Sequence, residues 1–329
     1  MGGGGDQGGR ESRVRVDLTA VVIAMRDGEP HVLTVANDGA SGVALPFGPL
    51  QAGHPTLQTG LRRWVEDLTH RKLGYVEQLY TFADHAPFQP NADHGADHQT
   101  ISIAYLALAA SPEDSATLQG RWRRWYGFFP WEDRRGGGPA ARAHLLERLF
   151  AWAEAQRDAG DADCVERVRL AFGADGAAWD EERALERYEM LYEADLAPEA
   201  ALDLGLEPSA AANGMPGLPM FADHRRILAT AISRLRAKIK YRPVLFELMP
   251  AAFTLTNLQR TAEALSGVPL HKQNFRRLVA QQGLVEDTGA MATGTGGRPA
   301  KLVRFRREVT VERPAPGVRL RATRRGSYP

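Results

Sequence analysis

The sequence predicts an α+β protein built in two parts, and three features of the chain lead to this prediction. The first 110 residues alternate strand-like segments with one amphipathic helix, as in a mixed sheet with a helix packed on it. Residues 111–207 are largely helical in pattern. Residues 241–309 then contain three short helices followed by two strands. A repeated parallel βαβ unit fits this order less well than α+β.

Four strands are expected in the first part. Val14–Met25 alternates polar and apolar residues and then continues as an apolar, β-branched run, as in a half-buried strand. Asp27-Gly28 supplies a turn to a second strand at His31–Ala36, so the pair should form a hairpin. Gln78–Ala83 and Thr100–Ala109 provide the other two strands.

The helices are expected where apolar residues recur at steps of three and four. Leu57–Leu73 has such a stripe and lies between the second and third strands. In the helical segment, Ala140–Arg157 and Glu181–Leu196 are the clearest helices, whereas Ala210–Pro219 is expected to be a loop. His224–Lys240 is a further helix, which Pro243 ends. Its apolar face is formed by Ile227, Leu228, Ile232, Leu235 and Ile239.

The order of elements in residues 241–309 is that of a winged helix-turn-helix domain, which places the second helix of its helix-turn-helix pair in the major groove of DNA. Gly267–Pro269 would form the turn between the second and third helices of this region. A glycine-rich loop would join the two strands of the wing. The expected elements are helices at Val244–Met249, Thr254–Leu265 and His271–Gln282 and strands at Leu284–Glu286 and Leu302–Phe305.

The third of these helices has the polarity of a recognition helix. Phe275, Leu278 and Val279 are spaced to face a core, and basic and amide side chains occupy the rest of the helix. Lys and Arg suit phosphates and guanine edges, whereas Gln and Asn suit adenine edges. The alternative is a solvated charged helix in a small protein-interaction module. The predicted DNA-binding residues are Lys272, Gln273, Asn274, Arg276 and Arg277 on the helix and Arg298 and Lys301 on the wing.

The charge is distributed unevenly along the chain. Tyr241–Pro329 has 15 Lys and Arg against 6 Asp and Glu, whereas Met1–Lys240 has 26 against 34. This asymmetry indicates an acidic part joined to one that meets a polyanion. Residues 310–329 are expected to form a basic tail, and residues 1–12 a disordered, glycine-rich leader.

The composition limits the remaining classes of protein. The only cysteine, Cys164, cannot form an intrachain disulfide, which favours a reducing compartment and excludes cysteine-based zinc fingers. No segment approaches the roughly 20 apolar residues that span a bilayer. A cytoplasmic protein without a membrane partner is therefore expected.

Gly48–His70 resembles a degraded Nudix box, the metal-binding loop and helix of pyrophosphate hydrolases. Gly48, Arg62, Trp64 and Glu66 match the family pattern, and Asp67 stands in for its second glutamate. His54 replaces the first glutamate of the pattern, Arg63 replaces the glutamate that follows the arginine, and Thr69 replaces the final glycine. Arg63 removes a hard oxygen ligand and places a cation where Mg²⁺ would bind. We therefore expect no catalytic residue, no metal site and no required cofactor. The predicted effector-binding residues are Phe47, Arg62, Arg63, Glu66 and Asp67.

The run from Asp223 to Gly289, followed by GGRPAKLVRF, resembles the linker helix and winged helix of Nudix-related transcriptional regulators of the NrtR type. The long helical segment and WYGFFPWEDRR are closer to the NadQ branch, which regulates NAD biosynthesis. The resemblance implies a Nudix-like sensor over 13–222 with a helical insertion at about 111–207, a linker helix at 223–240 and a DNA-binding domain at 241–309. It also implies a homodimer that represses genes of NAD metabolism from a palindromic operator and responds to ADP-ribose, NAD or ATP.

Several alternatives stay open. One alternative function is a Nudix hydrolase of ADP-ribose or NAD-like substrates, and another is a nucleotide-regulated, protein-binding adaptor. The Asp-His pairs at 84–85, 93–94 and 97–98 look like metal ligands but fall in a polar loop, where such residues are commonly solvated. Arg63 would contact a phosphate or pair with Glu66 or Asp67. The aromatic run at 122–131 would stack on a base, although packing or a dimer contact is favoured.

Overall fold

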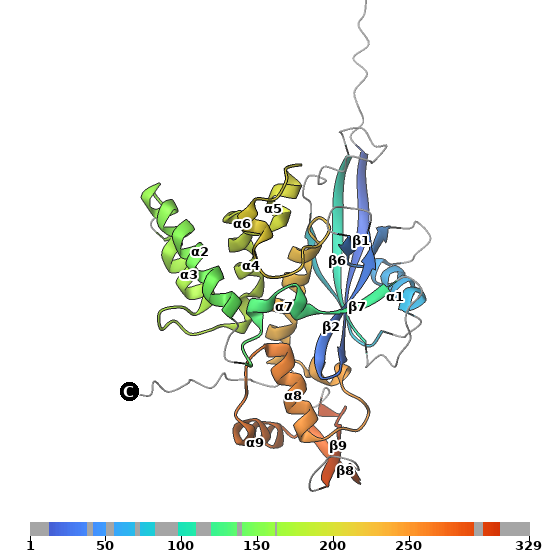
Figure 1. The fold of residues 1–329 in the computed structure, drawn as a ribbon. Coiled ribbons are helices and arrows are strands. Elements are labelled where there is room, and N and C mark those ends of the chain that lie inside the picture. Colours follow the sequence, from blue (N-terminus) through green and yellow to red (C-terminus); the bar gives the residue numbers. More distant parts are fainter. Residues whose placement is uncertain are drawn as a thin grey trace, which may run out of the picture.

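The computed structural model describes residues 13–37, 42–50, 56–69, 73–82, 98–109, 120–136, 140–161, 163–292 and 299–309 (Figure 1). Within these ranges, seven strands form one mixed sheet in the order β3-β2-β1-β6-β5, with β4 paired to β1 and β7 paired to β2. The strands are β1 (Arg13–Arg26), β2 (Glu29–Ala36), β3 (Val43–Ala44), β4 (Phe47–Pro49), β5 (Val76–Phe82), β6 (His98–Leu108) and β7 (Gly120–Arg124).

The central strand β1 organises the sheet. It pairs in parallel with β6 from Arg13 opposite His98 to Ile23 opposite Leu108, and it forms the expected hairpin with β2. Apolar side chains at 21, 23 and 25 face one side of the sheet, and those at 18, 20, 22 and 24 face the other. Both faces of β1 are therefore buried, which explains its apolar run.

One strand differs from the sequence prediction. Residues 120–124 were expected in a helical insertion, but they form β7, antiparallel to β2 with Leu33 opposite Trp122. The segment pairs with the edge of β2 that faces away from β1. Trp122 packs on the apolar cluster that contains Val22 and Leu33. Tertiary pairing, rather than local periodicity, decides this strand.

Helices cover both faces of the sheet (Figure 1). On one face lies α1, through Leu61 and Val65, and on the other lies α7, which separates the sheet from the helices of residues 140–213. The predicted helices are present, α1 is described as far as Thr69, and a short α6 lies in the expected loop. The helices are α1 (Leu57–Thr69), α2 (Ala140–Asp158), α3 (Cys164–Phe172), α4 (Ala184–Glu193), α5 (Pro198–Asp203), α6 (Ala210–Asn213) and α7 (His224–Ile239).

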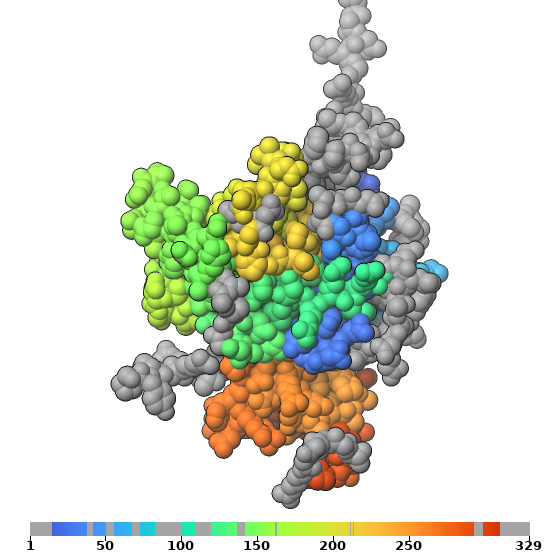
Figure 2. All heavy atoms as spheres, in the orientation of Figure 1, coloured from blue at the N-terminus to red at the C-terminus, as the bar shows by residue number. Residues whose placement is uncertain are grey.

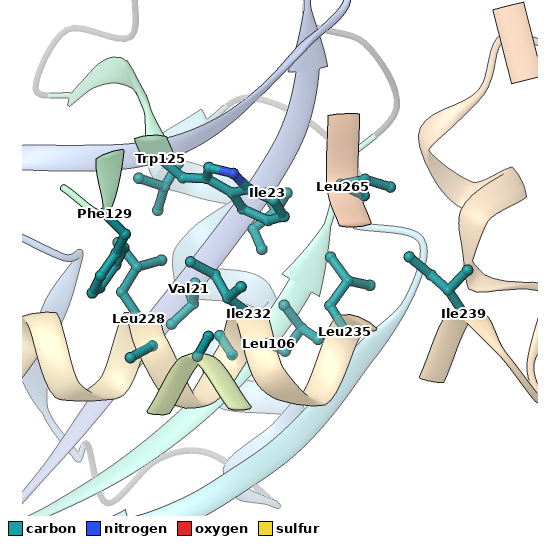
Figure 3. Packing of buried hydrophobic residues seen from close by; sticks show 14 of the residues in the cluster. Val21, Ile23, Leu106, Trp125, Phe129, Leu228, Ile232, Leu235, Ile239 and Leu265 are labelled. Atoms are coloured by element: carbon teal, nitrogen blue, oxygen red, sulfur yellow. The ribbon is translucent and has the colours of Figure 1, made fainter. Parts of the chain in front are cut away.

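The helix expected as a linker, α7, lies in the middle of the core. All five residues predicted for its apolar face are at most 1% exposed. The opposite side of α7 is also covered, because α4 packs on it. In Figure 3, Trp125 and Phe129 lie beside the apolar side chains of α7, together with Val21 and Ile23 of the sheet.

The aromatic run of the sequence belongs to the core. Trp125, Phe128, Phe129 and Trp131 are at most 1% exposed. Trp125 and Trp131 lie in two 3-10 turns, at Trp125–Gly127 and Pro130–Glu132, and the two phenylalanines lie between these turns. This result confirms packing, rather than base stacking, as the role of these four rings. The segment runs from β7 across the molecule and brings its last residues against α7 and α4.

A buried carboxylate joins three separate elements at the end of this segment. Glu132 accepts hydrogen bonds from Arg187 of α4, at 2.5 and 2.8 Å, and from Arg236 of α7, and all three side chains have no exposed surface. Burial opposes ionisation of Glu132, but the two guanidinium groups prevail and lower its pKa. Arg187 also donates to the backbone oxygens of Ala171 and Asp180.

The C-terminal part has the predicted element order of a winged helix-turn-helix. Thr254 caps the start of α8 by accepting a hydrogen bond from the backbone N–H of Asn257. The ring of Phe246 stacks on that of Phe305, with 4.3 Å between the ring centroids. This part packs directly against the segment 120–136 and the sheet (Figure 2). Its elements are a 3-10 helix (Pro243–Leu248), α8 (Leu255–Ser266), α9 (Lys272–Gln282), β8 (Val285–Ala292) and β9 (Ala300–Phe305).

We expect Glu132→Gln to lower the free energy of unfolding by about 3–5 kcal/mol, because it leaves two buried guanidinium groups without a counter-charge. Glu193→Gln is the matched control, since Glu193 pairs with Arg167 on the surface, where such pairs contribute at most about 1 kcal/mol. Urea unfolding of the three proteins measures the difference. Equal losses in the two variants would contradict a structural role for the buried carboxylate.

A second prediction concerns pH. Burial lowers the pKa of His224 to about 3, and its Nδ1 accepts the backbone N–H of Leu45 at 3.0 Å. Below the unfolded pKa of about 6.5, only the unfolded chain binds this proton, so the free energy of unfolding falls by about 1.4 kcal/mol per pH unit. His224→Gln should remove this loss between pH 6.5 and 5, whereas His144→Gln, at an exposed position, should retain it. Urea unfolding at the two pH values tests this.

Candidate nucleic-acid interface and effector site

The helix α9 presents a basic face to solvent. Phe275 and Val279 are 3% and 1% exposed and anchor the helix to the core, as their spacing predicts. The sequence of α9 contains no acidic residue. Within the described residues, no ion pair joins its cations to a carboxylate. The residues on its exposed surface include Lys272, Gln273, Asn274, Arg276 and Arg277.

The wing differs from α9, because the cations described there have acidic partners. Lys301 lies 2.9 Å from Asp287, and Arg304 lies 2.5 Å from Glu286, both across the ribbon. The hydrogen bond from Lys301 is the main reason that the pKa of Asp287 is lowered. Arg298 lies outside the described residues. On the surface that the structure describes, α9 is therefore the stronger attractor of polyanions.

This pairing on the wing is not evident from the sequence. Glu286 lies directly opposite Arg304 in the strand register, whereas Asp287 lies opposite Val303. Opposite charges on facing strands are a recognisable pattern once the register is known. A register shift between Asp287 and Met291 hides the pattern in the sequence.

Two residues of the degraded Nudix box hold the chain that follows α1. Arg62 donates to the backbone oxygens of Leu73 and Gly74 and lies 3.9 Å from Glu66. Glu66 accepts the backbone N–H of Leu73 at 3.0 Å. These side chains therefore fasten the residues just before β5 to α1, and an ion pair within this helix joins Glu66 to Arg62.

The other two charged residues predicted on α1 face solvent. Arg63 and Asp67 are exposed and four positions apart, so they share one side of α1. Trp64 is half-buried and lies against Gly48, at 3.8 Å from an ideal Cβ on that glycine. The exposed side of α1 thus offers one cation and one carboxylate.

Phe47 does not join this group. Its ring lies 5.7 Å from that of Phe221 and 5.0 Å from that of His224, at the start of α7. Gly48, the next residue of β4, faces Trp64 of α1 instead, since successive residues of a strand point to opposite faces. The structure therefore separates Phe47 from the α1 side chains by the thickness of the sheet.

No metal centre emerges from the described residues, because no group of three His, Cys, Asp or Glu side chains lies together among them. The Asp-His pairs at 84–85, 93–94 and 97–98 lie outside this part, apart from the backbone of His98 in β6. Cys164 is a buried free thiol. Among the helices of the described ranges, none is long and apolar enough to cross a membrane.

Comparison with known proteins supports the two-part architecture. Residues 245–305 match the family described as "NrtR DNA-binding winged helix domain". The "ADPR responsive transcriptional repressor NtrR" of Acinetobacter baylyi is 41% identical over 88 residues, which are 27% of this chain and 35% of that protein. The matching segment thus spans about a third of this relative's length.

The fold comparison covers much more of the chain. The structure of Shewanella oneidensis NrtR complexed with a 27mer DNA has a TM-score of 0.53 and 20% identity, covering 90% of this chain and 95% of that one. A MutT/nudix family protein from Enterococcus faecalis has a TM-score of 0.51 and 15% identity, covering 90% and 89%. The chain therefore carries an NrtR-type winged-helix domain at residues 245–305, joined to a sheet and helices with the Nudix-like fold of NrtR.

Proposed function

We propose that this chain is a DNA-binding transcriptional repressor of genes of NAD biosynthesis and metabolism, whose Nudix-like part senses a nucleotide. The observation that carries the proposal is the exposed cationic and amide face of α9 in a winged-helix domain. The Acinetobacter relative is named a repressor, and the Shewanella neighbour is described in complex with DNA.

The DNA partner in this proposal is a palindromic operator bound by a homodimer. Two copies related by a two-fold axis present two copies of α9, and a site with the same symmetry accepts both. Each α9 would enter a major groove, with Arg276 and Gln273 at base edges and Lys272 and Arg277 near phosphates. Asn274 and the wing residues Arg298 and Lys301 complete the proposed contact surface.

The effector in this proposal is an adenine nucleotide that contains a diphosphate. ADP-ribose is favoured over NAD and ATP, because the Acinetobacter relative is named as ADPR responsive. Arg63 and Asp67 remain free to meet a ligand at the surface of α1, whereas Arg62 and Glu66 would act by holding the start of β5. We propose that Phe47 acts from the other face of the sheet, beside α7.

The same geometry argues against hydrolysis. Mg²⁺ requires several oxygen ligands, and Arg63 stands where the family has a carboxylate. Glu66 uses one carboxylate oxygen for the backbone of Leu73. A ligand that binds one conformation better can still change DNA affinity without turnover. We propose that α7, which packs on the sheet and precedes the winged helix, transmits this change.

The deciding experiment combines a gel shift with a turnover assay. The protein should retard the DNA upstream of its own gene, with an affinity that falls steeply with salt as phosphate contacts are lost. ADP-ribose, NAD and ATP are then added separately, and the one that shifts the binding curve is the effector. Steady hydrolysis of ADP-ribose or NAD with Mg²⁺, without DNA binding, would replace this proposal by a Nudix hydrolase.

Replacing a base-reading arginine provides a residue-level test. Arg276→Ala should weaken operator binding by about 1–3 kcal/mol, because a bidentate contact to a base is lost. Arg169→Ala, at a surface position on α3 paired with Glu166, is the matched control and should bind as the wild type does. Fluorescence anisotropy with labelled operator measures both. Unchanged affinity of the Arg276 variant would remove this residue from the interface.

The two adjacent arginines of α1 should behave differently. Arg62→Ala should lower the free energy of unfolding by about 1–2 kcal/mol, because it removes the hydrogen bonds to Leu73 and Gly74. Arg63→Ala should leave stability within about 0.5 kcal/mol, as at other surface positions, and should weaken nucleotide binding. Urea unfolding and calorimetric titration with ADP-ribose separate the two effects, and equal nucleotide affinity in Arg63→Ala and the wild type would exclude Arg63 from the site.

A further inference from the structure

The C-terminal end of α8 is held by the sensor part of the molecule. Three donors reach its last carbonyl oxygens: the Tyr126 hydroxyl binds Ala264 at 2.7 Å, Arg236 Nε binds Leu265 at 2.9 Å, and the backbone N–H of Arg134 binds Gly267 at 2.7 Å. The last carbonyls of a helix have no partner within the helix. The Gly267 N–H itself caps the Glu263 oxygen, and the body of the protein caps the carbonyl oxygens that follow.

These donors have little freedom to move. Arg236 is fully buried and held by Glu132, which Arg187 fixes in turn. The Tyr126 hydroxyl oxygen also lies 3.5 Å from Nη2 of Arg236. Burial raises the pKa of the Tyr126 phenol, so its hydroxyl stays protonated and can donate. The cap thus depends on the same buried carboxylate that joins α4 to α7.

The backbone approaches closely at this point. Gly267 has φ +75°, and a Cβ on it would lie within 3.0 Å of the Glu132 carbonyl oxygen. Real Cβ atoms essentially never approach that closely. A side chain at this position would therefore push the end of α8 away from the segment that contains Glu132.

The start of α9 is tied to α8 through the turn between them. Glu263 of α8 accepts the backbone N–H of Leu270 at 2.9 Å, and Gln259 donates to the oxygen of Leu270 at 3.1 Å. The turn between the helices is therefore tied to α8, and α9 begins two residues later, at Lys272. A rotation of α8 about its capped end would carry α9 with it.

We propose that Tyr126 and Arg236 are positioning residues for DNA recognition, which fix the direction in which α9 leaves the body of the protein. This inference rests on the proposed function, because it concerns how two copies of α9 meet two half-sites. With the hydrogen bonds from Tyr126 and Arg236 in place, the two recognition helices of the dimer are held at a fixed distance and a fixed relative rotation. Without them, α8 and α9 pivot together and accept half-sites at other spacings.

The test compares operator spacings rather than affinity alone. Tyr126→Phe removes the hydroxyl but keeps the ring, and Tyr192→Phe removes the matched hydroxyl that binds Asp203 in the helical part. Each full-length protein is titrated with the operator and with versions that have one base pair added or removed at the centre. One base pair turns a half-site by about a tenth of a helical turn.

The wild type and Tyr192→Phe should both discriminate strongly against the altered spacings. Tyr126→Phe should lose roughly threefold to tenfold of this discrimination, as expected for one hydrogen bond. A purely structural role would lower the fraction of active protein or the Tm and leave the ratio between spacings unchanged. The same ratio in all three proteins would therefore overturn the inference, whereas absence of operator binding by the wild type would overturn the proposed function.

Two glycine substitutions, one as the test and one as its control, provide an independent experiment. They are used because substitutions of Arg236 or Glu132 would disturb the core. Gly267→Ala forces the end of α8 away from Glu132 and should give the same loss of spacing discrimination. Gly176→Ala is the matched control, because Gly176 has φ +82° with nothing within 4 Å of an added Cβ. Both variants bear a similar backbone strain, so a loss of discrimination in both, or in neither, would contradict the inference.

Discussion

The buried ion cluster of Glu132 with Arg187 and Arg236 is the constraint on which the rest of the structure depends. A carboxylate without exposed surface has to be matched by positive charge, and here the charge comes from two helices far apart in the sequence. The cluster ties the aromatic segment after β7 to α4 and α7. Because Arg236 also donates to the end of α8, the same charges hold the winged-helix part.

The Nudix-like part and the winged helix share one apolar core as well. A continuous cluster of buried side chains includes Val21 and Ile23 of the sheet, Ile232 of α7, Leu265 of α8 and Phe275 of α9. The winged helix is therefore packed on the Nudix-like part rather than joined to it by an exposed tether. A ligand that altered the packing around α7 would act on a surface that α8 also contacts, and the proposed coupling of the two parts would rest on this contact.

The segment that resembles a degraded Nudix box makes structural contacts. Its two surviving charged residues, Arg62 and Glu66, hold the backbone at Leu73 and Gly74. Tyr75 and Glu77, the next polar side chains along the chain, contact Lys238 at the end of α7. The box is thus connected through a few residues to the helix that precedes the winged domain. Arg62 and Glu66 thus stabilise the connection between α1 and the residues that contact α7.

Much of this architecture is determined by local sequence. The hairpin of β1 and β2, the apolar stripe of α7 and the faces of α9 follow from periodicity, turns and caps, since these act within a few residues. Three features needed the tertiary structure: β7, which exists because β2 offers an edge; the partners of Glu132, which lie 55 and 104 positions away; and the separation of Phe47 from α1. Pairing between distant segments leaves no signal in either segment alone, because burial and charge are set by what the fold brings against them.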